Sequence, residues 1–152
     1  MTIEAGHGAR ISLLELEQGR LTPITHEGVI NFAVSPDGST IATRGPDPAI
    51  RLYPIDGSAV REVPGMTGVE SLDGWITEGL LITRPRDPKS PLGEIYRVDI
   101  QTGRQVSWKN IVPDDRSGIM LLQSFRVTPD GHSQAYTWHR ALSNLYIVDG
   151  LS

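Results

Sequence analysis

Apolar residues in this chain recur at every second position, in short runs that are separated by glycine and proline. Within residues 50–53 and 94–99 the large side chains step by two residues, which is the period of a β-strand. No stretch has a convincing helical period. The pattern therefore predicts an all-β fold of short strands and tight turns.

One five-residue pattern occurs four times: aliphatic, Tyr or Leu, any residue, aliphatic, acidic. Its second positions are Leu14, Tyr53, Tyr96 and Tyr146, at spacings of 39, 43 and 50 residues, and a glycine follows each copy closely. Repeats of about 40–50 residues are typical of the blades of a β-propeller. The spacing therefore favours a repeat architecture.

A second repeated motif lies ahead of the first and has the composition of a turn. Ser35-Pro36-Asp37-Gly38 returns as Thr128-Pro129-Asp130-Gly131, 93 residues later. Proline fixes φ at the first central position, and Asp-Gly suits the tight end of a hairpin. A middle copy is expected near residues 75–79, where only the final glycine remains.

Both motifs fit one unit of four strands. The predicted strands are 10–16 and 20–24, then 30–34, 40–44, 50–55 and 60–63, then 69–76, 79–83, 94–100 and 105–109, and finally 121–128, 133–138 and 144–148. The corresponding units are 1–27, 28–66, 67–112 and 113–152. We therefore expect a partial β-propeller of about 3.5 blades of four antiparallel strands. Because the first and last units are short of strands, we expect the last part of a larger propeller, with self-association through its incomplete blades.

The Ser/Thr-Pro-Asp-Gly turn, followed by a Leu-Tyr-x-Val-Asp strand, resembles the PD40, or TolB-like, class of WD40-like propeller repeats. Residues 128–151 are also similar to the C-terminal end of bacterial proteins in which a eukaryotic-like serine/threonine kinase is joined to a propeller. The resemblance implies a non-catalytic module that binds or senses a protein, peptide or ligand in a kinase-type signalling protein. It also implies that the chain belongs to the extracytoplasmic part of a membrane-anchored protein.

Two alternative functions remain open beside a binding or sensing module. One is a propeller that gates a fused prolyl-oligopeptidase-like hydrolase. The other is a TolB-like periplasmic interaction protein. A repeat segment with a purely structural role is a third reading of the same pattern.

Composition and motifs exclude several kinds of partner and functional site. The net charge is −4 and Lys and Arg are scattered, so nucleic acid is not an expected partner. The apolar runs are far shorter than the ~20 residues that a membrane-spanning helix needs, so direct membrane insertion is not expected. There is no cysteine, and the four histidines lack metal-ligand spacing. In the segment that starts at His139, Ala141 stands where a kinase catalytic loop has its aspartate. We expect no catalytic, cofactor-binding or metal-binding residues.

The candidate contact surface is a long loop over residues 85–91, which has three prolines and mixed charge. Loops on rigid scaffolds carry binding function, so Arg86, Asp87 and Lys89 are predicted contact residues. Trp138 is added to them, because a tryptophan at the mouth of a propeller channel can stack on a ligand.

Overall fold

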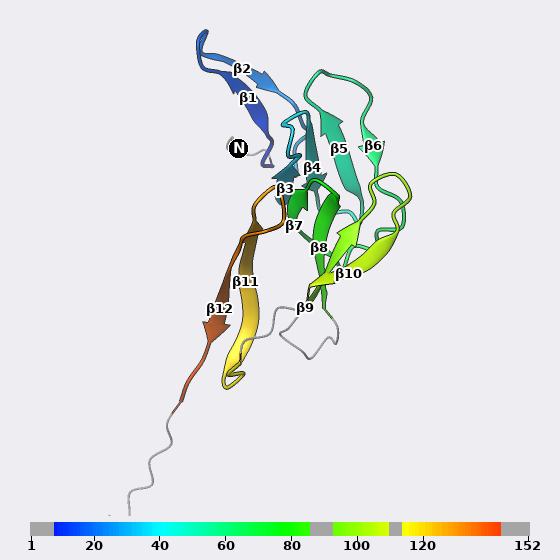
Figure 1. Cartoon of the computed structure of the whole chain (residues 1–152). Helices are drawn as coiled ribbons and strands as arrows, with labels where there is room; N and C mark the ends of the chain where they lie inside the picture. Colours follow the sequence, from blue (N-terminus) through cyan, green and yellow to red (C-terminus); the bar gives the residue numbers. More distant parts are fainter. Residues whose placement is uncertain (1–7, 86–92, 110–113, 144–152) are drawn as a thin grey trace, which may run out of the picture.

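The computed structural model describes residues 8–85, 93–109 and 114–143. These residues form four antiparallel sheets, and no helix occurs among them. The two four-stranded sheets lie side by side, and a two-stranded sheet lies at either end of the series (Figure 1). The predicted all-β class is confirmed, whereas among the described residues four strands per sheet are found only in the two middle sheets.

The sheets follow the chain, and each is an up-and-down series of neighbouring strands. The first contains β1 (Ser12–Glu15) and β2 (Arg20–Pro23), and the second contains β3 (Asn31–Val34), β4 (Thr40–Arg44), β5 (Ile50–Pro54) and β6 (Arg61–Glu62). The third contains β7 (Ser71–Ile76), β8 (Gly79–Pro85), β9 (Gly93–Val98) and β10 (Gln105–Lys109), and the fourth contains β11 (Ile119–Val127) and β12 (Gln134–Arg140).

The strand bounds follow the predicted ones closely. β4 and β10 have the predicted bounds, whereas β9 ends two residues early, at Val98. It ends there because the Asp99 carboxylate accepts hydrogen bonds from the backbone N–H groups of Gln101 (2.9 Å) and Thr102 (2.8 Å), which turns the chain. The strand predicted over 144–148 lies outside the described residues.

The two copies of the Ser/Thr-Pro-Asp-Gly motif form the same turn. The N–H of Gly38 donates to the carbonyl of Ser35, and the N–H of Gly131 donates to that of Thr128, both at 2.8 Å. In both copies the aspartate carboxylate accepts from the preceding hydroxyl and from the N–H two residues later. Both glycines have φ near +70°, at 73° and 72°, a region that glycine enters without strain.

The third sheet replaces this motif with a two-residue hairpin between β7 and β8. Ile76 pairs directly with Gly79. At Gly79 φ is 149°, and a Cβ there would lie 2.5 Å from the backbone oxygen of Val98 on β9. The retained glycine therefore allows the close approach of β9.

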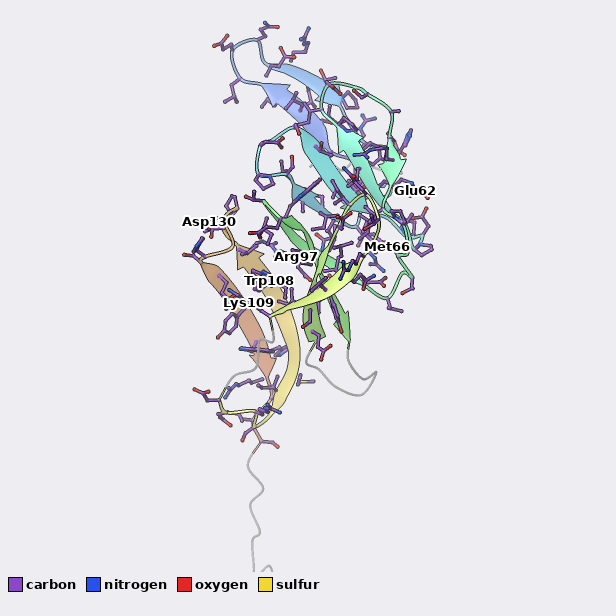
Figure 2. The ribbon with its side chains drawn as sticks, turned by 45° about the vertical axis from the view of Figure 1, so that its right-hand side comes forward. Glu62, Met66, Arg97, Trp108, Lys109 and Asp130 are labelled. Atoms are coloured by element: carbon purple, nitrogen blue, oxygen red, sulfur yellow. The ribbon has the colours of Figure 1, made fainter. Side chains whose placement is uncertain are left out.

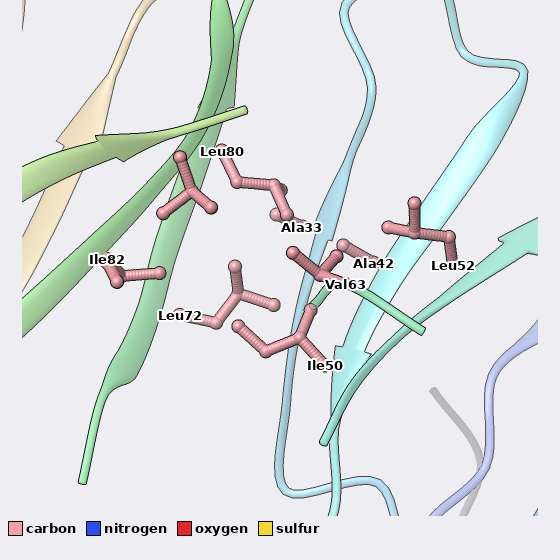
Figure 3. Packing of buried hydrophobic residues seen from close by; sticks show 9 residues of the cluster. Ala33, Ala42, Ile50, Leu52, Val63, Leu72, Leu80 and Ile82 are labelled. Carbon is pink, nitrogen blue, oxygen red and sulfur yellow. The ribbon is translucent and has the colours of Figure 1, made fainter. Parts of the chain in front are cut away.

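The largest core lies between the second and third sheets. Figure 3 shows Ala33, Ala42, Ile50, Leu52 and Val63 facing Leu72, Leu80 and Ile82. Burial of each Leu or Ile side chain contributes about 1.5–3 kcal/mol. This layer therefore holds the two four-stranded sheets together.

Two smaller cores join the end sheets to the middle ones. Phe125 of β11 packs with Ile76, Leu81 and Ile95 of the third sheet, and Trp108 covers them. At the other end Ile11 and Val29 pack with Ile41 of the second sheet. Figure 2 shows Trp108 next to Lys109, whose Nζ lies 4.5 Å from the ring centroid of Trp108. Each sheet is thus packed against the next one along the chain.

Candidate binding groove

The first strands of the last three sheets, β3, β7 and β11, lie next to one another, and each is an edge strand of its sheet. A groove of about 300 Å³ opens between them. Its lining residues are Asn31, Phe32, Ala33, Val34, Asp73, Gly74, Trp75, Arg126, Val127 and Pro129. Residues separated by almost 100 positions therefore share one concave surface.

A bulge in β7 places Asp73 in the groove. Leu72 pairs with Ile82 and Gly74 pairs with Leu81, so Asp73 is the extra residue. Bulges of this kind redirect a side chain. A Cβ on Gly74 would lie 3.3 Å from Cγ1 of Val127 on β11, so this glycine lets β11 approach β7 at the bulge.

Polar side chains form hydrogen bonds with backbone groups along the groove. Nδ2 of Asn31 donates to the carbonyl of Leu72 (2.5 Å), and Oδ1 of Asn31 accepts from the N–H of Phe32 (2.8 Å). Nη1 of Arg126 donates to the carbonyl of Phe125 at 2.7 Å. Blocked edge groups discourage the pairing of a further strand, so the groove is suited to recognition through side chains.

Asp73 is the acidic residue among those that line the groove. Burial raises the pKa of its carboxyl, an effect that hydrogen bonds from Thr83 and Ser71 and, to a lesser degree, the positive charge of Arg126 oppose. Its Oδ2 atom is buried and has no hydrogen-bond partner within the described part of the chain. The groove therefore contains a polar acceptor that is poorly solvated.

The remaining wall of the groove is apolar. Phe32 is 41% exposed and Val34 is 47% exposed, and Trp75 is half-buried against the largest core. A small set of polar groups within an apolar wall is typical of ligand sites. At about 300 Å³, the groove matches the lower end of the size range of ligand pockets.

Of the four predicted contact residues, Arg86, Asp87 and Lys89 fall outside the described residues. Trp138 is half-buried against the Phe125 core, with its ring edge-to-face with Tyr136 at 5.7 Å between centroids. Trp138 therefore packs on the third sheet and does not line the groove.

Sequence reasoning missed the polar groove residues Asn31, Asp73 and Arg126. The one local signal was Asp73-Gly74, which interrupts the apolar alternation of 69–76, as a bulge does. Asn31 and Arg126 carried no such signal, since a single polar residue in a strand is ordinary.

Glu70 is a second acid that the sequence did not single out, and it is only 2% exposed. Its carboxylate accepts from the N–H (3.0 Å) and Oγ1 (2.8 Å) of Thr67 and from the N–H of Gly68 (2.8 Å). These bonds shape the loop that enters β7. We assign Glu70 a structural role.

No three His, Asp or Glu side chains within 8–85, 93–109 and 114–143 lie close enough together to hold a metal ion. Among the same residues there is no helix with the length and apolar character of a membrane span.

Comparison with protein-family models gave no match, and comparison with curated proteins gave none either.

Proposed function

We propose that the chain is part of a β-propeller that acts as a non-catalytic binding module for a peptide or protein segment, with the groove between β3, β7 and β11 as its binding surface. The observation that carries the proposal is the convergence of three first strands on one groove. In a propeller, the sheets are arranged radially around a central channel, and their first strands would line it.

Three further features support a propeller. The two middle sheets are four-stranded and up-and-down. Successive sheets pack face to face in chain order. The turn at Pro129 also meets the β7–β8 hairpin of the preceding sheet, where the N–H of Thr77 donates to the carbonyl of Pro129 at 2.9 Å.

The groove favours a peptide over a strand-forming partner. Asn31 already binds backbone groups of β3 and β7, so main-chain pairing is blocked there. Phe32, Val34 and Trp75 offer apolar contacts to side chains, and Asp73 and Arg126 add an acidic and a basic residue to the lining. The proposed link to a kinase-type signalling protein is a separate part of the proposal, and the resemblance of residues 128–151 supports it.

Selection of displayed random peptides on the chain tests this function. We expect enriched peptides whose affinity falls about tenfold, or about 1.4 kcal/mol, when Phe32→Ala or Asp73→Ala alters the groove. Asp114→Ala changes an exposed loop acid outside the groove and should leave the affinity unchanged. Enriched peptides that bind all three variants equally, or a selection without enrichment, would refute the proposal.

A further inference from the structure

Each middle sheet has a face toward the preceding sheet, here called the rear face, and a face toward the next sheet, called the forward face. In the second sheet, Leu52 points forward into the core shared with Leu72 and Leu80. Ile41 points to the rear, where it packs on Ile11. Tyr53 pairs with Ile41 across the strands, and directly paired residues share a face. Tyr53 therefore belongs to the rear face.

The third sheet repeats this arrangement at equivalent positions of the five-residue pattern. Ile95, the equivalent of Leu52, points forward to Phe125. Val98, the equivalent of Ile55, points to the rear and packs with Leu52. Both side chains are fully buried. The repeat therefore specifies apolar residues on both faces of a sheet.

The first sheet has the same rear positions, but they are exposed. Leu14, the equivalent of Tyr53, is 50% exposed, whereas Tyr53 is 5% exposed. Leu21 pairs with Leu14 on the same face and is 52% exposed, and Leu16, the equivalent of Val98, is 88% exposed. A rear face that is covered in the next two sheets is thus uncovered in the first.

The rear surface therefore consists of Leu14, Leu16 and Leu21, all from the β1–β2 hairpin. Phe32 and Val34 lie on β3 of the second sheet and line the groove, so the rear surface and the groove share no residue.

The opposite end of the series is polar. Arg126 occupies the position of the forward residue Ala33, and it is exposed. Ser124 and Thr137 lie on the same face and are joined through their hydroxyls at 2.9 Å. Stacking the forward face of a second copy on the rear surface would bury the Arg126 charge against leucines, which is strongly unfavourable. Head-to-tail stacking of copies is therefore disfavoured.

We propose that the rear surface docks a further β-sheet of the same repeat, one that presents an aliphatic forward face like that of Ile50 and Leu52. The repeat itself identifies this occupant, because a sheet of that kind covers the equivalent positions twice within the chain. The inference rests on the proposed propeller architecture. It specifies that the partner binds at the first sheet and that the partner presents an aliphatic sheet face.

The test fuses an extra copy of residues 28–66 ahead of the full chain, through a flexible glycine-serine linker. Docking should raise the denaturation midpoint and reduce the fluorescence of a dye that binds exposed apolar surface. The matched control fuses the same copy behind the full chain, next to the polar forward face, and should give neither change. The double variant Leu14→Ser, Leu21→Ser should abolish both changes, while Leu142→Ser, at a site 77% exposed on another part of the surface, should not.

Equal effects of the two fusions, or no effect of the first, would overturn the inference. Sedimentation of the unfused chain tests whether a second copy of the chain binds the rear surface instead. A dimer that the double variant abolishes would show that it does and would contradict the proposal. The double variant replaces exposed side chains, so an unchanged circular dichroism spectrum separates docking from folding. Peptide binding at the groove is measured on the unfused chain, so the two proposals can fail separately.

Discussion

Asp37 stabilises its turn through hydrogen bonds that favour the charged carboxylate. Bonds from the hydroxyl of Ser35 and from the backbone and hydroxyl of Ser39 lower its pKa from 3.8 to about 2. Because the folded pKa lies below the unfolded one, this stabilisation is present above pH 3.8 and is lost as the pH falls towards 2. We expect a carboxyl titration by NMR with a midpoint near 2, and a higher midpoint in Ser35→Ala. A wild-type midpoint near 3.8 would contradict the observed geometry.

Asp73 presents the reverse case. Burial raises its pKa, so between the ordinary and the raised pKa the folded protein binds more protons than the unfolded chain. Stability from this group therefore falls as the pH rises through that interval. Asp73→Asn removes the charge, and we expect it to raise the urea midpoint at pH 7. The gain should disappear at about pH 3, below the ordinary pKa of aspartate.

Asp114→Asn, in an exposed loop, is the control for the Asp73 measurement and should change the midpoint little at either pH. A lower midpoint of Asp73→Asn at pH 7 would show that the hydrogen bonds from Thr83 and Ser71, together with the Arg126 charge, outweigh burial in setting the state of the carboxyl.

At the scale of elements, the hairpin between β7 and β8 depends on Gly79. In Gly79→Ala the new Cβ would meet the backbone oxygen of Val98 at 2.5 Å, and neither backbone can move without breaking the ladder between β8 and β9. We expect a loss of about 3 kcal/mol, in the upper part of the usual range for single substitutions. Urea denaturation measures this loss.

Gly19→Ala is the matched control for that substitution. Gly19 lies in the hairpin between β1 and β2 with φ +63°, and a Cβ there would meet nothing within 4 Å. Only the left-handed conformation is penalised, by about 1–2 kcal/mol. Equal losses in the two variants would mean that the close contact at Gly79 relaxes easily.

Strands were predictable because their signals are local. The alternation around Thr40–Arg44 and the turn at Pro36-Asp37-Gly38 define β4 within one short window. The early end of β9 was not predictable, because it depends on the hydrogen bonds that the Asp99 side chain makes in the folded chain. Likewise the bulge at Asp73 exists only in the pairing of β7 with β8.

The groove could not be predicted from local patterns, since it joins Asn31, Asp73 and Arg126 from three separate sheets. Only the packing order of the sheets brings these residues together. Glu70 illustrates a second limit. A glutamate between two apolar strands normally indicates an exposed position, whereas here three hydrogen bonds compensate for its burial. Burial of such a residue depends on loop geometry that the sequence does not reveal.

For the whole molecule, the uneven packing of the four sheets predicts a gradient of local stability. Repeat proteins have stabilities that depend on each unit and its neighbours. β8 lies inside the third sheet, and its Leu80, Leu81 and Ile82 are fully buried by cores on both faces. β1 and β2 form a sheet of two strands with an exposed rear face, and isolated two-stranded sheets are marginally stable.

Amide hydrogen exchange should therefore be slowest in β8 and β9 and much faster in β1 and β2, because local opening of the hairpin exposes little additional apolar surface. Exchange at one common rate in all four sheets would instead mean that they unfold as a single cooperative unit, and that the Ile11 core couples the first sheet to the second more strongly than its small size suggests.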